Sequence, residues 1–213
     1  MLNQIRLSAA VTSPEPGTVS ALLEQLGSME DLVSITAASA LLQTASIANL
    51  QELAVFIETY FEQLLVPLEL PLIYKSWQHA SNHECRELIA LDHSIAEQIL
   101  VPQFAAASQR VGRTHLNAMG SMRGERLVQR YLAAVEAGEA HGWHTVVYGI
   151  TLALYSLPVR QGLMHYAYRT MGGFVQAAAK SLNLTHRDCR DIVLAACEDL
   201  PRAIETTLTP AAA

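Results

Sequence analysis

The sequence predicts an all-α fold, a single-domain bundle of about nine or ten helices over residues 1–213. Three observations favour this class. Ala and Leu, which are strong helix formers, supply much of the 51% of residues that are hydrophobic. Only 11 Gly and 8 Pro occur in 213 residues, too few for a turn-rich β protein. No segment alternates apolar and polar residues with the period of two that is typical of strands.

The N-terminal part of the chain carries weak helical signals before a strong one. Residues 21–23 and 41–42 are apolar and lie in weakly amphipathic stretches, which predict two short helices. Asn49 with Glu52 three positions later is a capping pattern. Apolar residues then recur at helical spacing, so a helix is expected over residues 50–64.

Prolines and polar pairs divide the middle of the chain. Pro67 and Pro71 predict a break after the first strong helix. A second helix is expected to restart at Pro71, because the first turn of a helix tolerates proline. Ser81 with Glu84 indicates the cap of the next helix, and Pro102 opens a further one.

The C-terminal half predicts four helices separated by Gly, Pro or a capping pair. Their expected ranges are, in order, 127–135, 144–157, 158–182 and 185–208. The second of these is apolar nearly all round, which is typical of the central helix of a bundle. The last begins at Thr185, whose capping partner is Asp188.

Charge and composition argue against several classes of partner and location. The net charge is -6 and no basic tract is present to follow a phosphate backbone, so nucleic acid is not expected. Three cysteines at no regular spacing favour reduced thiols and a cytoplasmic location. Residues 1–16 lack the charged start and apolar run of a signal peptide. The longest uncharged stretch, residues 143–159, is shorter than a bilayer span, so no membrane partner is expected.

The common catalytic signatures do not occur in the sequence. It contains no Walker phosphate loop, no Gly-rich dinucleotide fingerprint, no nucleophile elbow and no His-Glu-x-x-His motif. Acidic pairs on helix faces suit a solvated surface better than acid-base catalysis. We therefore expect no enzyme, no catalytic residue and no cofactor.

Two groups of residues carry side chains that suit nickel, zinc or copper. The first is His79, His83 and Cys85, and the second is His141 and His144. Both lie at helix starts, where the regular spacing that would bring ligands together is broken, so the favoured interpretation is that neither binds a metal ion. A stand-alone nickel-binding protein that uses these residues stays open as an alternative.

The long helix over residues 158–182 combines aromatic, cationic and small side chains. These are Tyr166, Tyr168, Arg169, Gly172 and Gly173. Such a set is enriched in protein interfaces, and the glycine pair would let another backbone approach closely. The same composition suits a core helix equally well, so composition alone does not decide between an interface and a core.

Three segments in register resemble the UreF family of urease accessory proteins. Residues 144–149, His-Thr-Val-Val-Tyr-Gly, resemble the family's His-x-Val-Val-Phe-Gly segment. Residues 166–180 begin Tyr-Ala-Tyr, contain the glycine pair and end in a small-residue run before Lys, and are similar to the family's Tyr-x-Tyr helix. Residues 107–113 are similar to its Ala-Ser-x-x-x-Gly-Arg segment. The stretch between Gly27 and Leu42 departs from the family pattern, which indicates a divergent member.

The resemblance implies a helical, homodimeric and non-enzymatic chaperone. A member of this family is expected to join UreD, also called UreH, and the GTPase UreG, and to promote nickel insertion into apo-urease. The residues expected to bind these partners are Tyr166, Tyr168, Arg169, Gly172, Gly173, Lys180, Arg110 and Arg113. An unrelated helical enzyme, or a helical adaptor with no connection to urease, is the remaining alternative.

Overall fold

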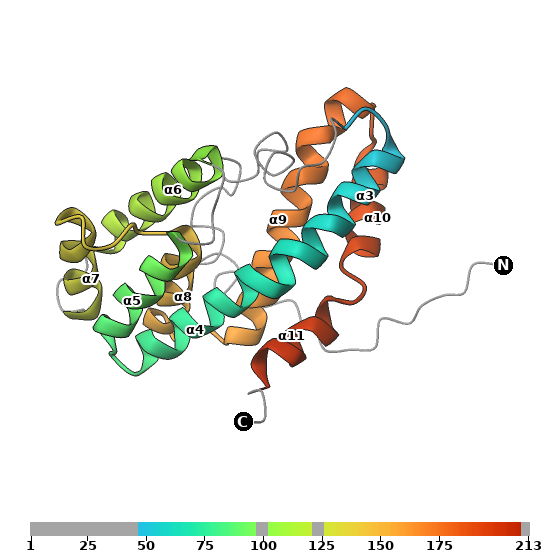
Figure 1. Cartoon of the computed structure of the whole chain (residues 1–213). Helices are drawn as coiled ribbons and strands as arrows, with labels where there is room; N and C mark the ends of the chain where they lie inside the picture. Colours follow the sequence, from blue (N-terminus) through green and yellow to red (C-terminus); the bar gives the residue numbers. More distant parts are fainter. Residues whose placement is uncertain (1–46, 97–101, 121–125, 210–213) are drawn as a thin grey trace.

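The computed structural model of the chain describes residues 47–96, 102–120 and 126–209 (Figure 1). Within these ranges every regular element is a helix and no strand occurs, so the all-α prediction is confirmed there. The two short helices expected at 21–23 and 41–42 lie outside the described residues. The described ranges hold eight continuous helices, fewer than the nine or ten expected for the chain.

The first described helix is longer than expected, because Pro67 and Pro71 do not break it. Helices α3 (Leu50–Tyr60), η2 (Phe61–Glu69) and α4 (Leu70–Ser81) follow one another without interruption (Figure 1). The middle segment is a π-helix, in which the Leu70 N–H reaches the Leu65 carbonyl five residues back. Pro67 has no N–H to donate, and the wider π turn accommodates it without ending the helix.

The ends of this helix test two predicted caps. The Asn49 side chain accepts the N–H of Glu52 at 3.0 Å, which confirms the predicted cap. The Ser81 prediction was wrong, since Ser81 is the last residue of α4 and α5 (Cys85–Ala96) begins four positions later. The intervening turn contains His83 with a φ of 59°, and a left-handed residue of this kind ends the helical path.

Helix α8 (His144–Leu154) lies at the centre of one half of the molecule. Every residue from His144 through Leu152 is buried, which confirms the predicted central helix. It packs mainly against α4 and α6 (Pro102–Gly120), while α5 packs against α7 (Arg126–Glu136). Gly149 allows α8 to approach α4, because an added Cβ there would lie 2.6 Å from the Ile73 carbonyl oxygen.

Helix α9 (Val159–Leu182) runs beside α3, and the two C-terminal helices pack against it (Figure 1). The capping box predicted at Thr185 and Asp188 is present at the start of α10 (His186–Ala196). The single last helix expected over 185–208 is instead two, α10 and α11 (Leu200–Leu208). The break has a physical cause, because Pro201 lacks an N–H and its ring would clash with the carbonyl four residues back.

Two apolar clusters form the interior. One lies between α3, η2, α9, α10 and α11, and the other lies between α4, α5, α6, α7 and α8. They meet along α4 and α8, each of which contributes residues to both clusters. None of the described helices combines the length and apolar character needed to cross a membrane.

Candidate functional site

A groove between α9 and α10 gathers four of the residues that the sequence singled out. It has a volume of about 670 Å³, and we call it the α9–α10 groove. The groove is lined by Tyr168, Arg169, Gly172, Gly173, Gln176 and Ala177 of α9, and by His186, Cys189, Arg190, Val193 and Leu194 of α10. No acidic residue is among them.

The α9 side of the groove follows from helical spacing. Positions three and four apart share a face, so Arg169 lies beside Gly172 and Gly173, with Gln176 following one turn later. Both glycines line the groove, and Gly172 has open space beside it. A Cβ added at Gly172 would meet no atom within 4 Å, so this position has room for a contact from outside the helix.

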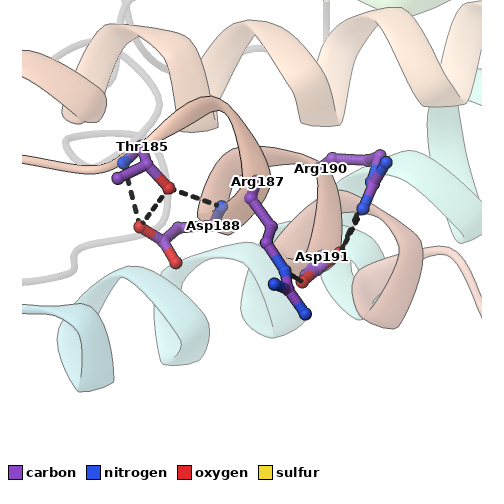
Figure 2. Close-up of polar contacts among 5 residues, drawn as sticks. All are labelled: Thr185, Arg187, Asp188, Arg190 and Asp191. Atoms are coloured by element: carbon purple, nitrogen blue, oxygen red, sulfur yellow. Dashed lines mark hydrogen bonds and ion pairs between the residues drawn. The ribbon is translucent and has the colours of Figure 1, made fainter.

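The start of α10 is polar and tightly organised (Figure 2). Thr185 and Asp188 cap each other, with the Thr185 N–H at 2.9 Å from an Asp188 oxygen. The hydrogen bonds from Thr185 lower the pKa of the Asp188 carboxyl. Asp191 lies 3.5 Å from the Arg190 Nε and 3.7 Å from the Arg187 Nε. Both carboxylates beside the groove are therefore engaged within α10. Because Asp191 partly neutralises Arg190, the basic character of the groove comes mainly from Arg169.

Tyr166 does not line the groove, because its side chain lies inside the molecule. Its side chain is only 3% exposed and forms a hydrogen bond with the Glu69 carboxyl inside the molecule. Two residues that are two positions apart on a helix point in different directions, so Tyr166 enters the core while Tyr168 lies half-buried at the groove.

The remaining predicted contact residues lie outside the groove lining. Lys180 is exposed on α9 one turn beyond Gln176, so it extends the basic face past the end of the groove. Arg110 and Arg113 are exposed on α6. The Arg113 Nε donates to the His141 carbonyl at 3.0 Å, which holds the loop before α8. The structure therefore brings together four of the eight predicted residues.

A buried acidic residue in the interior escaped the sequence reasoning. Glu69 is 4% exposed, and its carboxyl accepts the Tyr60 hydroxyl at 2.7 Å. Burial raises the pKa of Glu69 to about 7, although hydrogen bonds from Tyr60 and Tyr166 act in the opposite direction. Glu69 follows buried Leu65 by four positions, so an acidic residue on an apolar face was the signal that could have identified it.

Two histidines are also buried in the interior, and the ring of His144 stacks on that of Tyr166. His144 is 1% exposed, and its ring centroid is 5.3 Å from that of His115. Burial, with a smaller contribution from His115, lowers the pKa of His144 to about 3. Burial also lowers the pKa of His115. These imidazoles are consequently neutral at physiological pH and belong to the packed interior.

The side chains considered as metal ligands in the sequence do not come together in the structure. The His79 Nδ1 lies 2.7 Å from a Glu84 oxygen, and Cys85 is buried in the second apolar cluster. His144 is buried, whereas His141 is half-buried and contacts the ring of His93. In the ranges that the structure describes, no group of three or more His, Cys, Asp or Glu side chains could hold a metal ion.

A family model and two curated relatives all match this chain to the same family. Residues 47–197 match the model of the family described as UreF. A urease accessory protein UreF of Actinobacillus pleuropneumoniae is 22% identical over 163 residues, which cover 76% of this chain and 70% of that protein. A second, from serotype 5b strain L20 of the same species, is 21% identical over the same share of both chains.

Proposed function

The chain belongs to the UreF family, and from that membership we propose that it is a urease accessory subunit. In this proposal it assembles with UreD (UreH) and the GTPase UreG on apo-urease and promotes nickel insertion. Its contribution is surface and alignment, with the chemistry left to its partners. A cytoplasmic location and a homodimeric state are part of the same proposal.

The observation that carries the proposal is the α9–α10 groove. Tyr168 and Arg169 stand at its edge, and Tyr and Arg are the side chains most often found at energetic centres of interfaces. Gly172 has space beside it for a partner's side chain, and Gly173 also lines the groove. This combination of aromatic, cationic and open positions suits a docking surface.

The charge of the groove indicates the chemistry of the segment that docks there. Arg169 lines the groove, none of its described lining residues is acidic, and Lys180 continues the basic face, while Arg190 is paired with Asp191. Val193 and Leu194 add an apolar side, and Leu194 is 47% exposed. A partner segment that carries carboxylates beside apolar side chains would complement both features.

The test is restoration of urease activity in cells that lack their own UreF. The wild-type chain is expected to restore nickel-dependent activity and to co-purify with UreD and UreG. Tyr168→Ala with Lys180→Glu should impair both, because an interface aromatic contributes about 2 kcal/mol or more to binding. Circular dichroism should remain close to wild type, and thermal stability should fall only modestly, because Lys180 is exposed and the half-buried Tyr168 packs against the first apolar cluster. Full activation by the double variant, or none by the wild-type chain, would contradict the proposal.

A further inference from the structure

Two histidines from separate parts of the chain lie together on the surface. His93 is on the last turn of α5, and His141 is in the loop that precedes α8. Their ring centroids are 5.5 Å apart, and their planes are inclined at 80°. His93 is exposed and His141 is half-buried, so an ion in solution can reach the pair.

The backbone that carries the two rings is held by one buried side chain. Asp92 precedes His93 and is fully buried. Its carboxylate accepts the N–H of His141 at 2.6 Å and the N–H of Gly142 at 3.0 Å. It also accepts the Tyr131 hydroxyl at 2.6 Å. The loop is thus fastened to the end of α5, and the distance between the two histidines is set by contacts beneath them.

Two further contacts fix the same loop from other sides. The Trp143 Nε1 donates to the Asp92 carbonyl at 3.0 Å, and the Arg113 Nε donates to the His141 carbonyl at 3.0 Å. Gly142 has a φ of 74°, a conformation that glycine adopts without strain. A site whose supporting backbone is held this firmly loses little conformational freedom when an ion binds.

The distance between the two ring centroids is compatible with two imidazoles on one metal ion, once the His93 ring has turned. An imidazole nitrogen lies about 2.1 Å from a bound zinc ion, which places two ring centroids roughly 5 Å apart at a tetrahedral angle. The observed 5.5 Å is close to this value. The exposed His93 ring can turn about its Cβ–Cγ bond to direct a nitrogen toward the same point as His141.

We propose that His93 and His141 form a two-histidine site for a divalent transition-metal ion such as Ni²⁺. Neutral imidazole is a suitable ligand for nickel, copper and zinc. The Asp92 carboxylate beneath the pair favours a cation, whereas the nearby Arg113 opposes one. Water completes the coordination sphere, so the affinity is modest. The site is independent of the α9–α10 groove and does not rest on the proposed urease role.

The test is titration of the purified full chain, without a histidine tag, with Ni²⁺ by calorimetry. One equivalent should bind. His93→Ala and His141→Ala should each weaken binding by roughly ten-fold or more. Addition of Zn²⁺ should shift the ring resonances of these two histidines in nuclear magnetic resonance spectra. His93→Ala removes an exposed side chain, so this variant keeps the fold.

His83→Asn is the matched control, because it removes another exposed imidazole and asparagine tolerates the left-handed backbone at that position. Its nickel affinity should equal that of the wild type. The proposal is overturned if the double variant His93→Ala/His141→Ala binds Ni²⁺ like the wild type. It is also overturned if the wild type binds none, or if His83→Asn loses binding to the same degree.

Discussion

The buried ionisable residues give the interior a defined response to pH. Burial raises the pKa of Glu69 from 4.5 to about 7. Because the folded state holds this proton more tightly than the unfolded state, the stabilisation is fully present below pH 4.5. It is lost as the pH rises from 4.5 to about 7. Through Glu69, a lower pH therefore increases the free energy of unfolding. A salt-bridged carboxylate usually has the opposite effect.

Glu69→Gln provides the first prediction. The amide cannot ionise but its oxygen can still accept the Tyr60 hydroxyl, so the variant lacks this pH dependence. Relative to wild type, its free energy of unfolding should increase by roughly 3 kcal/mol between pH 4.5 and pH 7.5. Urea unfolding of both proteins across this range measures the difference. A difference that stays constant with pH would contradict the raised pKa.

His144 provides the second prediction, with the opposite sign. Its pKa is lowered by burial from 6.5 to about 3, so its stabilising contribution is present above pH 6.5 and is lost as the pH falls toward 3. His144→Gln removes the titration. The stability deficit of this variant should shrink by roughly 2 kcal/mol between pH 6.5 and pH 4.5. A deficit that is the same at both values would show that His144 titrates normally.

Single residues also mark the limit of the sequence reasoning. Tyr166 and Tyr168 were assigned to one surface because they form one motif, although their spacing sends them in different directions. His141 and His144 were grouped by proximity in sequence, but the helix start turns His144 inward and the loop brings His141 to His93. The second pairing spans two elements, so it depends on tertiary packing that no local pattern contains.

At the scale of elements, the sequence predicts a helix well where its apolar positions recur at helical spacing and a capping or proline signal marks its start. The cap at Asn49, the start at Pro102 and the central helix α8 are present as expected. Besides the cap at Ser81, the errors concern proline, because the effect of proline depends on the local turn. Pro67 is accommodated in a π-helix, whereas Pro201 ends the helical path that was expected to continue. Neither outcome follows from the residue type alone.

The close approach of α4 and α8 yields the third prediction. Gly149→Ala places a Cβ against the backbone of Ile73, and backbone atoms cannot move aside as a flexible side chain would. The variant should lose about 1–3 kcal/mol of stability, as overpacked cores do. Gly172→Ala is the matched control in another helix, where the added Cβ meets no atom within 4 Å. Because alanine restricts the unfolded chain, this control should gain about 0.5–1 kcal/mol.

Thermal or urea unfolding of the two glycine variants distinguishes the effects. Equal stability changes in Gly149→Ala and Gly172→Ala would mean that α8 can shift away from α4 without cost. The α4–α8 contact would then not be a rigid junction between the two apolar clusters.

For the whole molecule, the arrangement separates a packed interior from the α9–α10 groove, which is the proposed docking surface. The two apolar clusters meet along α4 and α8, and Glu69, His115 and His144 lie within that interior. The α9–α10 groove lies on one of the two clusters, on helices that contribute Cys189 and Phe174 to it. A change of charge on the groove can therefore alter binding while leaving the interior unchanged.

The central claim is that the α9–α10 groove docks the urease partners, and its most direct test is a charge reversal at Arg169. Arg169→Glu should reduce capture of purified UreD and UreG by roughly ten-fold or more, with unchanged thermal unfolding. Arg130→Glu makes the same change at an exposed position on α7 and should bind like the wild type. Wild-type binding by Arg169→Glu, or an equal loss in Arg130→Glu, would contradict the claim.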